Sequence, residues 1–353
     1  MSMTAEAEAP ATTVPWSSTA CLEKGQAKET AGQLTEAIAW YDRARADLGV
    51  ARADAAAQRL RGVCWMNRGN ALQKSGTPAN LREAVRAYDE GIACFETLSI
   101  ETVPVVRNHL GAAWLNRGHA LMSGAKPEAA VASLERAILH LSQLPLDADV
   151  SYRLNLAGAW TNLALLLHPE LPGPACSAAR SALALLEDRE FTRSEFLEMS
   201  LRARRALVVA LGERLVTADA AGESTTELAD EAVDAIEGGL SLLRRCERPE
   251  VVRFRALAAR LFRLGVQLYR IHQPHFLAEF VLETVEYPAF ENEADVVSAA
   301  RDAIAETVAD LHRPQLILAG TPAATRLLET LSSLRTAQHR LTCLGASDSL
   351  LLS

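Results

Sequence analysis

Three stretches decide the fold because they repeat one another. GVCWMNRGNAL begins at Gly62, GAAWLNRGHAL at Gly111 and LAGAWTNLALLL at Leu156. Each contains a tryptophan, any residue, an asparagine, any residue and then a small residue. The tryptophans are spaced by 49 and 46 residues. Self-similarity at a period of about 20–50 residues is the sequence signature of a repeat protein.

The small residue that ends each motif extends this register along the chain. At intervals of 44, 49, 46, 48 and 53 residues, the small residues are Gly25, Gly69, Gly118, Ala164, Gly212 and Gly265. Apart from Cys21 and Lys28 in the first unit, large apolar side chains stand four residues before and three residues after each of them. These positions share one face of a helix. We call the small residues notch residues, because each leaves a hollow into which a neighbouring helix fits.

A second pattern follows each notch residue. It reads LTEAIAWYDRA, LREAVRAYDEG and PEAAVASLERA in the first three units. The alanine at the fourth position (Ala37, Ala84 and Ala130) stands 12, 15 and 12 residues after the notch residue. That gap accommodates the end of one helix, a short turn and the start of an antiparallel partner. We expect the tryptophans of the first helices to be buried where helices pack.

This pattern resembles the tetratricopeptide repeat, whose first helix reads W-x2-L-G-x2-Y and whose second carries spaced alanines. The resemblance is strongest over residues 17–187 and weakens beyond 190. The repeats are longer than the family's usual period, and the surplus lies between them. The resemblance implies an all-α fold, a right-handed superhelical α-solenoid of antiparallel helix pairs.

The sequence predicts three regions. Residues 1–15 are of low complexity and are expected to be disordered. Residues 16–290 form about six helix pairs, and residues 291–345 add capping helices. The predicted helices span 17–31, 33–48, 53–75, 79–98, 103–123, 127–143, 149–168, 174–188, 193–218, 225–246, 250–272, 275–286, 294–312 and 322–343.

An asparagine row is the most specific candidate site. Asn67, Asn116 and Asn162 each stand two residues after a tryptophan. The resemblance places this helix on the concave face, where a row of amides can bind the backbone of an extended peptide. The alternative is that these amides bond neighbouring repeats.

Arginines supply the remaining candidates. Arg68 and Arg117 follow two of the asparagines and could bind an acidic ligand; alternatively, they pair with acids on the second helix of the same or the next repeat. Arg263 belongs to a basic stripe that could receive an acidic segment, or could pair with the acidic helix before it. The stripe is Arg253, Arg260, Arg263 and Arg270.

Composition argues against several other functions. The net charge of −8 disfavours a nucleic-acid partner. No run of about 18 apolar residues predicts a membrane span, and the N-terminal sequence lacks a secretory signal, so we expect a cytoplasmic protein. The six cysteines form no CxxC pair and are expected to be reduced.

No catalytic or metal motif is present. His272 and His275 lack a third ligand with suitable spacing, so neither a metal nor another cofactor is expected. We therefore expect no enzyme, but a scaffold that binds a peptide or protein partner in its concave groove. The alternative is a structural or oligomerisation protein whose groove is filled by its own C-terminal helices or by a second copy.

Overall fold

The computed structural model describes residues 17–48, 54–168, 170–186, 194–244, 248–285, 294–311 and 329–341. Within these ranges all regular secondary structure is α-helix and no strand occurs. The all-helical fold expected from the sequence is therefore confirmed. The predicted disordered tail, residues 1–15, lies outside the described ranges. Among the described helices, none combines the length and apolar character that a membrane span requires.

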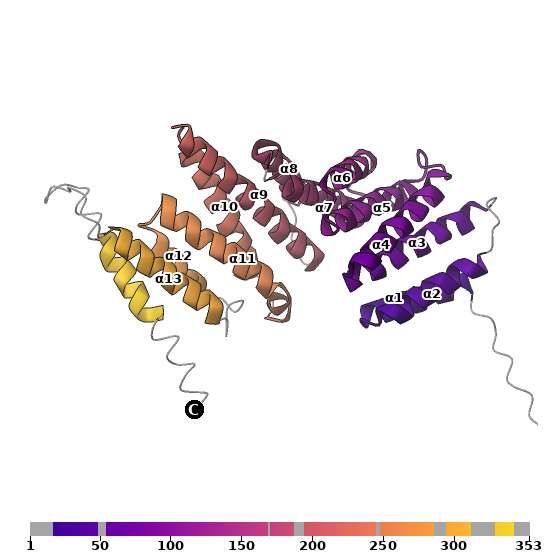
Figure 1. Cartoon of the computed structure of the whole chain (residues 1–353), viewed down its shortest axis with the longest axis horizontal. Coiled ribbons are helices and arrows are strands. Elements are labelled where there is room, and N and C mark those ends of the chain that lie inside the picture. Colours follow the sequence, from indigo (N-terminus) through magenta and orange to yellow (C-terminus); the bar gives the residue numbers. More distant parts are fainter. Residues whose placement is uncertain are drawn as a thin grey trace, which may run out of the picture. The chain divides into compact units, whose positions relative to one another are not determined.

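The chain divides into two compact units, residues 1–145 and 146–353. The helices of unit 1 are α1 (Ser18–Thr30), α2 (Leu34–Asp47), α3 (Ala55–Ser75), α4 (Pro78–Glu96), α5 (Pro104–Ser123) and α6 (Pro127–Leu141). They pack as consecutive pairs, and each second helix also packs against the first helix of the next pair (Figure 1). This sequential packing is that of an α-solenoid.

Unit 2 also consists largely of paired helices, and its α9 and α11 are the longest helices described, with 27 and 25 residues. Its helices are α7 (Val150–Leu167), α8 (Pro172–Ala184), α9 (Ser194–Ala220), α10 (Thr226–Arg244), α11 (Arg248–His272), α12 (Leu277–Val285) and α13 (Ala294–Leu311). Residues 329–341 are also helical. Helix α11 packs against α9, α10 and α13 as well as against its partner α12. The helix boundaries lie close to those predicted from the sequence.

Local sequence explains where helices begin and end. Asp54 caps the start of α3 by accepting a hydrogen bond from a backbone N–H, and Thr77 does the same for α4. Pro78 occupies the first turn of α4, where its missing N–H costs nothing. Between these helices, Gly76 adopts a left-handed backbone conformation with φ of 70°.

The notch residues hold each pair together. A Cβ atom added at Gly69 would lie 2.6 Å from Cε1 of Tyr88 on the next helix, so the tyrosine ring fills the hollow. Tyr88 is fully buried there. The same relationship joins Gly25 with Tyr41, Gly118 with Leu134 and Gly265 with Phe280. The predicted role of these four notch residues is thus confirmed.

Two features of the notches differ from expectation. A second pair of glycines lies one heptad earlier, with Gly62 against Phe95 and Gly111 against Leu141. A Cβ atom added at Gly212 of α9, in contrast, would meet no heavy atom of another helix within 4 Å among the described residues. The register therefore continues into unit 2 at Gly212, but the hollow there is unfilled.

Candidate partner-binding surfaces

The arginines predicted to face a ligand bond neighbouring repeats instead. Arg68 on α3 donates from Nε to Oδ1 of Asp42 on α2 at 3.1 Å. Arg117 on α5 makes the equivalent bond to Asp89 on α4 at 2.7 Å, and also donates to Ser133 at 2.6 Å. Each arginine thus joins the first helix of one pair to the second helix of the pair before it. The arginines therefore pair with second-helix acids, as the alternative held, but these acids belong to the preceding repeat rather than to the same or the next one.

The tryptophans are half-buried, which corrects the expectation of full burial. The guanidinium carbon of Arg45 lies 3.5 Å from the ring centroid of Trp65, and that of Arg68 lies 5.7 Å from it. Arg117 lies 5.5 Å from the ring of Trp114. These rings pack against cations, which cover ring faces that apolar neighbours leave open.

A row of amides does join the first helices of unit 1. Asn116 of α5 donates from Nδ2 to Oδ1 of Asn70 on α3 at 3.1 Å, and the hydroxyl of Tyr88 donates to the same oxygen at 2.9 Å. Both lone pairs of that oxygen are therefore used. Asn67 lies one turn earlier on α3 and is half-buried, without a hydrogen bond to its side chain among the described residues.

A second rung lies one turn further along. Nε2 of Gln73 and Nδ1 of His119 are 2.9 Å apart, and these residues are 46 positions apart, close to one repeat. Lys74 makes a similar link to Glu29 of α1 at 2.6 Å. We call Asn67, Asn70, Gln73, Asn116 and His119 the polar ladder. Sequence reasoning found two of its members and missed the other three, which stand after rather than before the notch.

Asn162, the third predicted amide, lies in unit 2 and is buried, with 5% of its surface exposed. Its side chain accepts a hydrogen bond from Arg202 on α9 at 3.3 Å. Burial and the nearby cations Arg260 and Arg202 lower the pKa of Arg205 on α9. Guanidinium groups are thus gathered on the first helices of unit 2.

The arginines of the predicted basic stripe on α11 differ in exposure and in ion pairing. Arg263 is exposed, whereas Arg270 forms an ion pair with Glu306 of α13. The side chain of Arg253 lies outside the described residues. The cation of Arg270 is therefore paired with α13 rather than with the acidic helix α10 that the sequence suggested.

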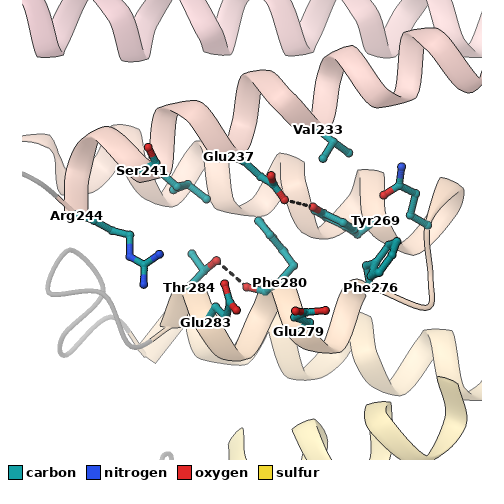
Figure 2. Close-up of a pocket in the computed structure, with 12 residues that line it drawn as sticks. Val233, Glu237, Ser241, Arg244, Tyr269, Phe276, Glu279, Phe280, Glu283 and Thr284 are labelled. Atoms are coloured by element: carbon teal, nitrogen blue, oxygen red, sulfur yellow. Dashed lines mark hydrogen bonds between the residues drawn. The ribbon is translucent and has the colours of Figure 1, made fainter. Parts of the chain in front are cut away.

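A cleft of about 450 Å³ opens between α10, α11 and α12 (Figure 2). Its floor is aromatic because Phe280 of α12 occupies the notch at Gly265. The ring centroid of Phe280 lies 4.5 Å from that of Tyr269 and 5.6 Å from that of Phe262, with both pairs stacked. Phe276, which is 47% exposed, lines one end.

The rim of this cleft is acidic. Glu237 accepts a hydrogen bond from the hydroxyl of Tyr269, while Glu279 and Glu283 are exposed on α12. Burial, the bond to Glu237 and the negative charges of Glu237, Glu279 and Asp234 all raise the pKa of Tyr269. Figure 2 shows Arg244 at the opposite end of the cleft from Phe276.

A second hollow of about 430 Å³ lies between α9 and α11 beside the unfilled notch of Gly212. Its lining is largely apolar and includes Leu215 and Leu268. Val216 and Ile271 also line it and are 70% and 67% exposed. Unit 2 therefore carries an exposed apolar surface as well as the acidic cleft.

The cysteines that the structure describes are buried in the core. Burial is the largest cause that raises the pKa of Cys64, to about 12, so its thiol is protonated at neutral pH. Cys21, Cys64, Cys94 and Cys176 are buried and are not in disulfides among the described residues, while Cys246 and Cys343 lie outside the described residues. In the part of the chain that the structure describes, no cluster of side chains suits a metal ion.

Comparison with known proteins places the central repeat in a family. The family model of the tetratricopeptide repeat matches residues 111–139, which comprise most of α5, the turn and most of α6. This segment of the chain is similar to a tetratricopeptide repeat. Its notch residue, Gly118, packs against Leu134 of α6. Tetratricopeptide repeats generally mediate interactions between proteins.

Other comparisons add little. No curated protein matches the chain. Among solved structures, one described as a "Circular tandem repeat protein with novel repeat topology and enhanced subunit contact surfaces" is similar at 14% identity, covering 95% of this chain and 79% of that one. The TM-score between the two structures is 0.26.

Proposed function

We propose that this protein is an interaction scaffold whose polar ladder in unit 1 binds the backbone of an extended peptide segment of a partner protein. The ladder lies on α3 and α5, which are the first helices of their pairs. Its side chains are half-buried or exposed, so their polar atoms can be reached without opening the core.

The main support for peptide binding is that several donors and acceptors of the polar ladder have no hydrogen-bond partner among the described residues. Asn70 uses both lone pairs of its oxygen, but its two N–H groups have no acceptor among the described residues. Asn116 uses its nitrogen, and its oxygen has no donor among them. Asn67 offers both groups. An extended peptide presents N–H and C=O groups in alternation, which matches this pattern of unused donors and acceptors.

The remaining predicted residues have different parts in this proposal. Arg68 and Arg117 hold the ladder in place by tying α3 and α5 to the preceding helices. In unit 2, Asn162 orients Arg202, and Arg263 remains exposed on α11. These guanidinium groups favour an acidic segment there. The proposed binding requires no nucleic acid and no cofactor.

A peptide-display selection tests the proposal. A phage library of random dodecapeptides is panned on the immobilised wild-type chain and, in parallel, on the Asn67→Ala/Asn116→Ala variant. We expect a consensus to be enriched on the wild-type chain and lost on the variant. Equal enrichment on both would remove the ladder from the binding site.

A control separates binding from assembly. Light scattering of the wild-type chain and of the same variant measures their molar masses. If the wild-type chain is a dimer and the variant a monomer, the ladder serves self-association, which is the oligomerisation alternative.

A further inference from the structure

The cleft between α10, α11 and α12 carries a second inference, which concerns unit 2 and is independent of the ladder in unit 1. A notch residue creates the cleft's floor. Because Gly265 has no side chain, Phe280 packs closely on α11 and stacks on Tyr269. The floor is therefore aromatic and closely packed.

The charged side chains that α12 contributes to the cleft are both negative. Glu279 and Glu283 are one helical turn apart and both line the cleft. Neither makes an ion pair or a side-chain hydrogen bond among the described residues. Their negative charges are thus placed beside low-dielectric aromatic surface, where a cation is attracted more strongly than in open water.

The opposite wall adds to the same field. Glu237 of α10 is exposed apart from its bond to the hydroxyl of Tyr269. That bond fixes the carboxylate on the cleft side of α10, as Figure 2 shows. Burial is the largest cause of the raised pKa of Tyr269, and the negative charges of Glu237 and Glu279 raise it further. In Figure 2 the cation of Arg244 lies at the end of the cleft nearer Glu283, and Glu279 lies nearer Phe276.

We infer that this cleft binds a basic side chain, an arginine or a lysine, presented by a partner protein segment. The aliphatic stem of such a side chain would lie on Phe280 and Phe276, and its cation would reach Glu279 and Glu283. Long cationic side chains place an apolar stem on apolar surface and keep the charge at its edge. A planar guanidinium also stacks on aromatic rings.

Other ligands fit less well. An anionic segment would meet three carboxylates, and like charges in close contact are repelled. A purely apolar side chain would cover the carboxylates without replacing their hydration, which is costly. A cation with an apolar stem satisfies both the floor and the rim.

The test uses two fluorescein-labelled nonapeptides that differ only in the group at the end of the central side chain. One has a central arginine flanked by leucines, and the other has citrulline, the neutral isostere, in its place. Fluorescence anisotropy gives the Kd of each for the full-length chain. A charge-assisted hydrogen bond predicts that the arginine peptide binds about tenfold more tightly. Equal Kd values for the two peptides would overturn the inference.

Variants then locate the site. In the Glu279→Gln/Glu283→Gln variant, the citrulline and arginine peptides should have nearly equal Kd values. The control variant Glu213→Gln/Glu223→Gln removes the same charge from exposed acids outside the cleft and should keep the preference for arginine. An undiminished preference in the first variant would assign the binding elsewhere and contradict the inference. Ser241→Arg offers a second route, because a guanidinium built into the cleft should compete and weaken binding of the arginine peptide. Circular dichroism melts check that each variant is folded.

Discussion

The ring of Tyr88 occupies the space that any side chain at residue 69 would need. A Cβ atom added at Gly69 would meet ring carbons Cε1 at 2.6 Å and Cδ1 at 2.9 Å. The ring cannot swing away freely, because its hydroxyl shares its one hydrogen between the side-chain oxygens of Asn70 and Gln73. The notch therefore couples the packing of α3 on α4 to the position of the polar ladder.

Gly69→Ala should destabilise the protein for this reason. Alanine in a helix interior normally gains about 1 kcal/mol over glycine, but overpacking a filled core costs about 1–3 kcal/mol. Because the clash is with a fully buried ring, we expect a net loss and a melting temperature lowered by several degrees. The measurement is a thermal melt followed by circular dichroism.

Gly212→Ala is the matched control and should have the opposite sign. This notch residue has no neighbour within 4 Å to clash with, so only the helix propensity gain of about 0.5–1 kcal/mol remains. We expect a small rise in melting temperature. A fall as large as that of Gly69→Ala would show that the notch is not what distinguishes the two positions.

The bond between Arg117 and Asp89 should be weak but measurable. Asp89 is half-exposed, and ion pairs at exposed sites are worth about 0.2–1 kcal/mol. A double-mutant cycle with Arg117→Gln and Asp89→Asn should give a coupling energy in that range. Because salt screens exposed charges, the coupling should shrink in about 1 M NaCl. A coupling that is unchanged by salt would contradict an exposed ion pair.

His109 should make unit 1 less stable as the pH falls. Burial and the nearby Arg59 lower the pKa of His109, and its ring packs 5.4 Å from that of Phe95. The unfolded chain therefore binds this proton more readily, so stability is present above the ordinary histidine pKa of about 6.5 and is lost below it. His109→Phe keeps a ring on Phe95 and removes the titration.

Melting temperatures between about pH 7.5 and pH 5 check this prediction. They should fall less steeply in His109→Phe than in the wild type. Some decline should persist, because burial also lowers the pKa of His140. Identical pH profiles would mean that His109 titrates equally in the folded and unfolded states.

The sequence was sufficient to predict the helices and most of their packing. The spacing of Gly69 and Tyr88 is a local feature of two adjacent helices, and local periodicity determines such contacts. The unfilled hollow at Gly212 could not be foreseen, since it depends on how α9 and α11 approach each other. The residues of α9 and α11 that line the hollow are at least 45 positions apart in the sequence.

The candidate sites were harder to predict. The sequence places Asn116 on a first helix, but whether its amide faces a ligand or Asn70 depends on the rotation of α3 relative to α5. The acidic cleft is lined by residues of α10 and α12 that are far apart in the sequence. Its acids Glu237 and Glu279 do not belong to a common sequence motif. Surfaces formed by residues distant in sequence leave no local pattern.

The affinity of the ladder for a selected peptide tests the central claim most directly. Isothermal titration calorimetry compares a display-selected peptide on the wild-type chain, on Asn67→Ala/Asn116→Ala and on Glu90→Gln, an exposed acid outside the ladder. Loss of two hydrogen-bonding amides, at about 0.5–1.5 kcal/mol each, predicts a Kd weakened by about fivefold to a hundredfold in the double variant. The Glu90→Gln variant should bind like the wild type. An unchanged Kd in the folded double variant would contradict the account.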